Sequence, residues 1–210
     1  MREKTEQLMR GEPFTYEWVF VEMLNFAALS EGVAVKARAA DLVIASQGPV
    51  EADWLSLDEV PEVVALKSGR PVLVIPRTGT FDSFGDAITV AWDGRREAAR
   101  AVFDALPLLQ KAKRVRVVTV TERNGKRGSN EVPGADIAVA LDRQGVRVET
   151  ATCADGSTGA GGALLADAAG SGCDMLVMGA YGHSRLREFV LGGATRHVLQ
   201  KATVPVLMSH

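Results

Sequence analysis

The sequence feature that most constrains the fold is a segment that occurs twice. ADLVIASQ is followed, 30 residues after Asp41, by Pro71 of GRPVLVIP. CDMLVMGA is followed, 31 residues after Asp174, by Pro205 of TVPVLMSH. Self-similarity at a fixed spacing indicates one supersecondary unit used twice, here a strand, a helix and a second strand. We therefore expect two related parts in the chain.

Short runs of apolar and β-branched residues predict the strands, at 16–22, 41–46, 70–76, 87–92, 115–120, 146–151, 174–179 and 204–209. Most are continuously apolar, as strands buried on both faces of a parallel sheet are. Helical patterns lie between them, most clearly at 96–109, where Ala98, Ala101 and Val102 share one face. The alternation predicts an α/β fold with a doubly wound open parallel sheet, in the order 3-2-1-4-5 for the five strands from residue 87 onward.

The two copies of the repeat differ in completeness. The strand at 87–92 opens the second copy well before Asp174, whereas the equivalent point of the first copy would fall before Met1. The stretch RTGTFDSFGD, at 77–86, has turn-forming residues and no apolar periodicity, which is typical of a boundary. We expect a partial first domain at 1–78 and a complete second domain at 86–210.

Composition and charge exclude several functions. Charged residues make up 24% of the chain and nearly cancel, at a net charge of -2, so we expect neither nucleic acid nor membrane as a partner. The N-terminal stretch lacks an apolar signal region, and no apolar run is long enough to span a bilayer, so we expect a cytoplasmic protein. Cys153, Cys173 and the histidines show no metal-ligand spacing, so we expect no metal site.

A glycine-rich stretch, GAYGHSRLREFVLGGATRHVL at 179–199, follows the strand at 174–179. Glycines let a backbone approach an anion closely, and the first N–H groups of a helix are free to bind phosphate. In a 3-2-1-4-5 sheet the strand order reverses between strands one and four, which places Asp93 beside Gly179. A second interpretation remains open: the glycines only form a turn and a helix start, and Asp93 only caps a helix.

The motif G-A-Y-G, nine residues and G-G-A-T resembles the nucleotide-binding signature of the universal stress protein family, which is G, two residues, G, nine residues, G and then Ser or Thr. The resemblance extends from AITVAWDG to VPVLMSH, and the first repeat resembles the back half of another such domain. The chain thus resembles a tandem member of this family, and we expect that it lacks the front of domain one. One position departs from the signature, because Gly193 stands where Ser or Thr is usual.

The resemblance implies a nucleotide and a set of residues that bind it. The ligand would be ATP, ADP or AMP, with Mg²⁺ as a candidate companion. Asp93 would contact the nucleoside, Val120 would line the adenine, and the glycine stretch would hold ribose and phosphates. The nucleotide-binding residues implied or placed at the same sheet edge are Ala91, Trp92, Asp93, Val120, Met178, Gly179, Tyr181, Gly182, His183, Arg185, Gly192, Gly193, Ala194 and Thr195.

The first repeat lacks this site, because Gly48 stands alone and Glu51, Asp53, Asp58 and Glu59 would repel phosphate. Neither a P-loop nor a nucleophile elbow is present, so we expect slow ATP hydrolysis at most.

The resemblance implies a stress-response module that acts through nucleotide-dependent conformation or association. The alternative is a dimerising interaction module without nucleotide. The final strands, at 70–76 and 204–209, would pair across the two repeats or across two chains, and an exposed edge formed by the strands at 16–22, 41–46 and 70–76 favours a homodimer.

Overall fold

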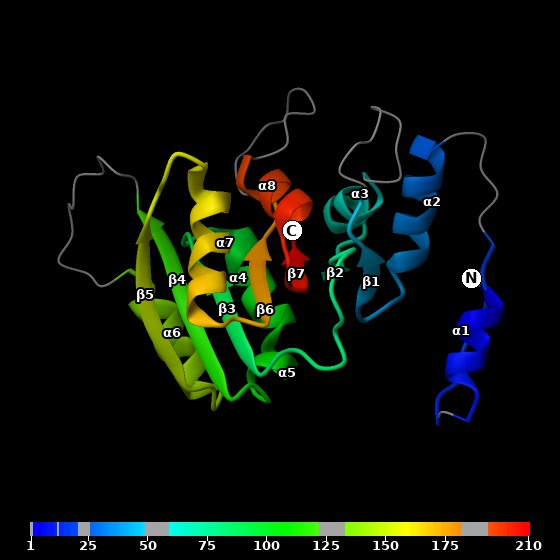
Figure 1. Cartoon of the computed structure of the whole chain (residues 1–210), viewed down its shortest axis with the longest axis horizontal. Helices are drawn as coiled ribbons and strands as arrows, with labels where there is room; N and C mark the ends of the chain where they lie inside the picture. The colour runs from blue at the N-terminus through cyan, green and yellow to red at the C-terminus, as the bar shows by residue number, and fades with distance from the viewer. Residues whose placement is uncertain (1, 12, 21–25, 49–58, 122–132, 182–192) are drawn as a thin grey trace.

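The computed structural model describes residues 2–11, 13–20, 26–48, 59–121, 133–181 and 193–210. Within them the strands form a single sheet in the order β1-β2-β7-β6-β3-β4-β5 (Figure 1). The strands are β1 Val43–Ser46, β2 Val72–Ile75, β3 Ala87–Ala91, β4 Arg114–Thr121, β5 Val148–Ala154, β6 Met175–Gly179 and β7 Val206–Ser209. The helices are α1 Arg2–Met9, α2 Phe26–Ala37, α3 Glu59–Lys67, α4 Arg96–Asp104, α5 Leu106–Leu109, α6 Ala135–Arg143, α7 Gly159–Ser171 and α8 Gly193–Lys201.

The predicted strand order of the second part is confirmed. Its strands lie in the order β5-β4-β3-β6-β7, which is 3-2-1-4-5, and every neighbouring pair among them is parallel. The two repeated units, β1-α3-β2 and β6-α8-β7, each consist of a parallel strand pair joined through a helix. The α/β doubly wound architecture is therefore as the alternation of strands and helices predicted.

The two repeats join through an antiparallel pair. Strand β2 pairs with β7 in the register Val72↔Met208, Leu73↔Leu207 and Val74↔Val206. The final strands therefore meet across the two repeats of one chain, which was one of the two arrangements expected. This corrects the idea of a homodimer through these strands, because β7 already has β6 and β2 on its two sides.

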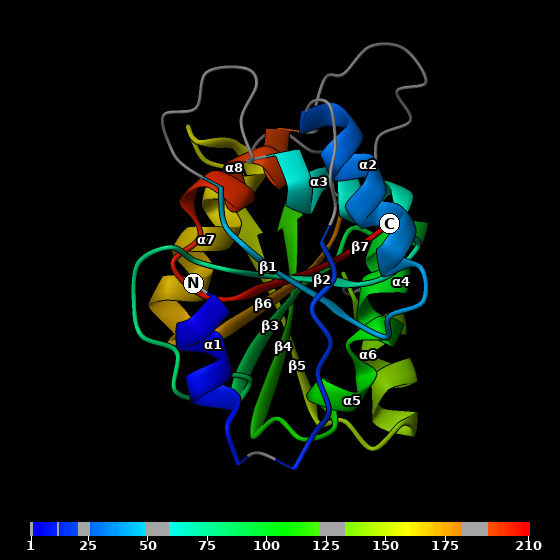
Figure 2. The same cartoon turned by 90° about the vertical axis from the view of Figure 1, so that its right-hand side faces the viewer.

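One predicted strand is wrong. Residues 13–20, which include most of the run YEWVFVE, form neither helix nor strand, and the Phe20 side chain is 74% exposed. A pattern of β-forming residues makes a strand only where an edge of complementary register pairs with it. Among the described residues, β1 has no neighbour on its outer side, and Figure 2 looks onto that edge.

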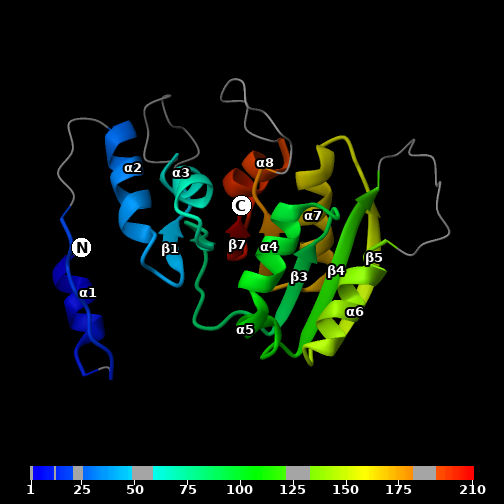
Figure 3. The same cartoon turned by 180° about the vertical axis from the view of Figure 1, so that it is seen from behind.

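The core lies on both faces of the sheet. On one face lie α4, α5 and α6 (Figure 3), and they cover residues such as Ile88, Val90 and Val117. On the other face α8, α3 and α2 cover residues such as Leu176 and Val206. Because both faces are buried, the central strands are apolar throughout, which explains the runs seen in the sequence.

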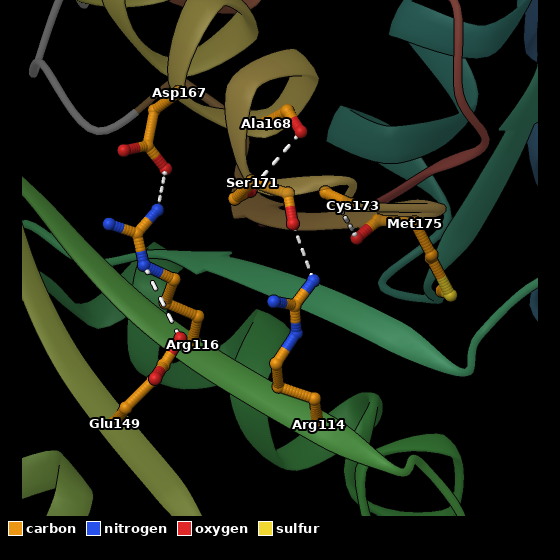
Figure 4. Close-up of polar contacts among 8 residues, drawn as sticks. All are labelled: Arg114, Arg116, Glu149, Asp167, Ala168, Ser171, Cys173 and Met175. Atoms are coloured by element: carbon orange, nitrogen blue, oxygen red, sulfur yellow. Dashed lines mark hydrogen bonds and ion pairs between the residues drawn. The ribbon is translucent and has the colours of Figure 1, made fainter.

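Helix α7 is held against β4 by arginines (Figure 4). Arg116 lies 2.5 Å from Asp167 of α7 and 3.5 Å from Glu149 of β5. Arg114 donates a hydrogen bond to the carbonyl of Ser171 at the end of α7. These contacts hold the last turns of α7 beside the first residues of β4. Among the described residues, no helix has the length and apolar content that a bilayer crossing requires.

Candidate functional site

A cavity of about 390 Å³ opens at the carboxyl ends of the parallel strands. The chain runs from β3 outward to β4 and β5, and then returns to the other side of β3 as β6. The strand order thus reverses between β3 and β6, which is where open α/β sheets bind ligands. The volume lies in the range of small-molecule sites.

The sequence-predicted residues converge on this cavity wherever the structure describes them. It is lined by Ala91, Trp92, Asp93, Val120, Met178, Gly179, Tyr181, Gly193, Ala194 and Thr195. The other predicted residues, Gly182, His183, Arg185 and Gly192, lie outside the described residues. Four separate stretches of the chain therefore contribute to the lining of one cavity.

The structure adds lining residues that sequence reasoning missed, namely Arg95, Glu97, Ala98, Val118, Asp155, Ala160 and Leu164. Asp155 follows β5 directly, so its place at the carboxyl end of a strand was a usable signal. The α7 residues Ala160 and Leu164 carried no such signal, because only the packing of α7 against α8 brings them to the cavity.

Asp93 shapes the turn that leads from β3 into α4. Its Oδ1 accepts a hydrogen bond from the N–H of Arg95 at 3.0 Å, and its Oδ2 lies 3.7 Å from Nε of Arg95. Helix α4 begins only at Arg96 and has no side-chain cap. Asp93 therefore stabilises a turn rather than capping the helix, and its half-exposed carboxylate still borders the cavity.

Gly179 allows the end of β6 to touch the first turn of α4. A Cβ at this position would lie 2.5 Å from the backbone nitrogen of Ala98 and 2.6 Å from the carbonyl carbon of Glu97. Any side chain would collide with backbone that cannot move aside. This glycine therefore has a packing role of its own, beside any contact with a ligand.

Glu97 places a buried carboxylate on the cavity wall. Its side chain is 6% exposed and lies 2.5 Å from Nε of Arg96. Burial opposes ionisation, but the hydrogen bond and charge of Arg96 outweigh it and lower the pKa of Glu97. The group is therefore a carboxylate at neutral pH, with its charge balanced by a neighbouring arginine.

The first turn of α8 forms the opposite wall. Tyr181 has a left-handed backbone, at φ 62°, and its N–H donates to Oγ1 of Thr195 at 3.3 Å. A Cβ on Gly161 of α7 would lie 2.8 Å from the carbonyl oxygen of Ala194, so this glycine lets α7 approach α8. The two contacts orient the start of α8, whose first N–H groups have no partners within the helix.

Trp92 is 9% exposed and belongs to the core cluster under α4 and α6, while one part of it borders the cavity. Its burial agrees with the interpretation of a strand-end aromatic as core.

Among the described lining residues, the charged side chains are Asp93, Glu97, Asp155 and Arg95. No metal-binding cluster of His, Cys, Asp or Glu occurs in the described part of the chain.

The chain is similar in sequence to proteins of one known family. The model of the universal stress protein family matches residues 86–210, more than half of the chain. A universal stress protein from Synechocystis sp. is 56% identical over 34 residues, which make up 16% of this chain and 12% of that protein. The match therefore spans a small part of the curated relative.

Solved structures share the fold at low sequence identity. A universal stress protein from Archaeoglobus fulgidus superposes with a TM-score of 0.68 at 18% identity, over 86% of this chain and 64% of that one. A protein of unknown function from Pseudomonas aeruginosa superposes with a TM-score of 0.61 at 16% identity, over 99% of this chain and 76% of that one. This chain spans less than two thirds of the Archaeoglobus protein.

Proposed function

This chain belongs to the universal stress protein family, and from that premise we propose that it is a stress-response protein whose cavity binds an adenine nucleotide. Binding would change the conformation of the chain or its association with partners. The observation that supports the proposal is that predicted site residues from separate parts of the sequence line the same cavity. Residues 91–93, 178, 179, 181 and 193–195 are far apart in the sequence and line one cavity at the point where the strand order reverses.

Each part of a nucleotide has a chemically suitable wall. Val118, Val120 and Leu164 offer an apolar surface for a base. Asp93 offers a carboxylate oxygen to ribose hydroxyls, and the free N–H groups at the start of α8 suit phosphate. Mg²⁺ would be held by the phosphates together with one or two carboxylates, as is usual for this ion.

The experiment has two stages. The purified protein is denatured and any released nucleotide is identified by mass, and the ligand-free protein is then titrated with ATP, ADP, AMP and adenosine by calorimetry. Asp93→Asn keeps an oxygen that can accept the Arg95 N–H but removes the charge. We expect it to weaken every one of these ligands by about 10-fold, because a hydrogen bond to a charged group is lost.

Asp86→Asn is the matched control. Asp86 lies at the other end of β3, its side chain is 58% exposed compared with 54% for Asp93, and it too is paired with a cation, Lys113. It does not line the cavity, so this variant should bind as the wild type does. If the wild type releases no nucleotide and gives no heat with millimolar ATP, the proposal is refuted.

A nucleotide-free interaction module is the second candidate. Two observations favour it: Gly193 lacks the hydroxyl of the family signature, and Asp155 adds a carboxylate to a cavity whose other two are paired with arginines. Among the described residues the outer side of β1 has no neighbouring strand, and we propose that a homodimer forms through β1 rather than through β7. Sedimentation velocity at micromolar concentration tests this, and a monomer would contradict it.

A further inference from the structure

Helix α8 is held at its far end by a side chain from the first repeat. Gln47 directly follows β1, and its Nε2 donates hydrogen bonds to the carbonyl oxygens of Leu199, at 2.8 Å, and Ala202, at 3.2 Å. Its Oε1 accepts the N–H of Arg77 at 3.2 Å. The last carbonyls of a helix have no partners within the helix, so this amide satisfies groups that α8 leaves open.

Comparison of the two repeats shows that the side-chain bonds of Gln47 are not part of the shared strand-helix-strand unit. Gln47 occupies the position that Ala180 has in the second copy. Both residues make the same backbone bond, from the N–H of Gln47 to Ile75 and from the N–H of Ala180 to Ser209, each at 2.8 Å. The methyl group of Ala180 cannot form the side-chain bonds of Gln47. The cross-repeat contact is therefore an addition to the shared fold.

A second contact reaches the cavity end of α8. Tyr181 lines the cavity and packs against the apolar cluster that contains Val64 and Ala65 of α3. Burial and the nearby carboxylate of Glu62, also on α3, raise the pKa of Tyr181 well above its usual range. The unit β1-α3-β2 thus contacts Tyr181, whose N–H is bonded to Thr195 at the start of α8, and also Leu199 in the last turn of α8.

We propose that Gln47 is a positioning residue for the cavity: through it, the first repeat fixes the orientation of α8 and with it the N–H groups that face a bound phosphate. The proposal rests on the proposed nucleotide function. Since coupling between two sites is reciprocal, a nucleotide that orders the start of α8 also strengthens the hold of the first repeat on its end. The first repeat then contributes to the site through the position of α8.

The test compares ligands with and without phosphates. Gln47→Leu has a similar size but cannot hydrogen-bond. We expect it to weaken ATP by about 3- to 10-fold, as the loss of one or two hydrogen bonds predicts, and to leave adenosine nearly unchanged. Gln47→Lys is the rescue variant, because a lysine donates to the last carbonyls and its charge suits the helix C-terminus. It should restore the affinity for ATP.

Lys67→Met is the matched control for stability. Lys67 pairs with Glu31 and so links α3 to α2 within the first repeat, without a hydrogen bond to α8. A purely structural effect would lower the melting temperature of Gln47→Leu and leave its ATP-to-adenosine ratio at the wild-type value, which is the ratio that we expect for Lys67→Met. An unchanged ratio in Gln47→Leu overturns the proposal.

Amide hydrogen exchange of the ligand-free protein separates this proposal from the proposed function. In Gln47→Leu we expect faster exchange in the last turn of α8 and also at residues 194–196, beside the cavity. If the wild type binds no nucleotide, the nucleotide function fails and exchange alone decides about Gln47. Unchanged exchange at 194–196 then overturns its positioning role.

Discussion

Gly193→Ser replaces the one residue that departs from the family signature. Gly193 is the first residue of α8 and borders the cavity. A Cβ built on it meets no atom within 4 Å among the described residues, and its φ lies outside the left-handed region. A serine therefore fits without strain and places a hydroxyl on the wall that is proposed to face phosphate.

The magnitude follows from the bond that is added. A hydrogen bond to a charged group contributes about 1.5 to 3 kcal/mol. Because about 1.4 kcal/mol is a factor of ten in affinity, ATP should bind about 10- to 100-fold more tightly. Adenosine has no phosphate and should bind with unchanged affinity.

The assay is calorimetric titration of wild type, Gly193→Ser and Gly193→Ala with ATP and adenosine. The alanine variant controls for the gain in helix propensity, which is about 1 kcal/mol for Gly to Ala. Its side chain has no hydroxyl. If the serine variant binds ATP no more tightly than the alanine variant, the phosphate does not lie at the start of α8. The same gain for adenosine as for ATP would refute the reasoning equally.

Three further predictions concern the scaffold around the cavity. Gly179→Ala should lower the free energy of unfolding in urea by about 1 to 3 kcal/mol or more, because its Cβ would lie 2.5 Å from the backbone nitrogen of Ala98; a wild-type midpoint would show that β6 can move away from α4. Asp167→Asn should lower the free energy of unfolding by about 1 to 3 kcal/mol, since it removes the charge of the nearer of the two carboxylates beside Arg116, in a pair that is mostly but not fully buried. A double-mutant cycle with Arg116→Met measures that coupling, and a value near zero would contradict it. The lowered pKa of Glu97 means that its contribution to stability is complete above its ordinary value of 4.5 and is lost as pH falls from there through the folded-state pKa. Glu97→Gln should therefore lose stability less steeply in acid than the wild type, and parallel acid-unfolding curves would argue against this.

The arrangement of the second part could be predicted because its signals are local and mutually consistent. Strands buried on both faces are largely apolar, so β3 and β6 stand out from the helices between them, and β4 does so beyond Arg116, at Val117 and Val118. The turn after β3 and the glycine stretch after β6 then occupy the same sheet edge once the order 3-2-1-4-5 is assumed. That order also predicts that Asp93 lies opposite Gly179.

Other features depended on contacts that no local pattern contains. The run at 16–22 has strand-forming residues, but its described part, 16–20, pairs with no strand of the described sheet. Leu164 reaches the cavity because α7 is held on β4 by Arg116 and approaches α8 at Gly161. These are consequences of how elements pack, and packing joins residues that are distant in the chain.

By itself, the sequence determined the α/β class, the repeated strand-helix-strand unit and most of the residues that border the cavity. These follow from apolar periodicity and from the conformational freedom of glycine, which act over a few neighbouring residues. Only the tertiary structure decided that β2 and β7 pair within one chain, that Gly179 is required by the backbone of α4, and that Gln47 reaches across 152 residues to α8. The physical reason is that a hydrogen bond or a close approach between distant segments depends on the whole fold, and neither has a periodicity that a sequence can display.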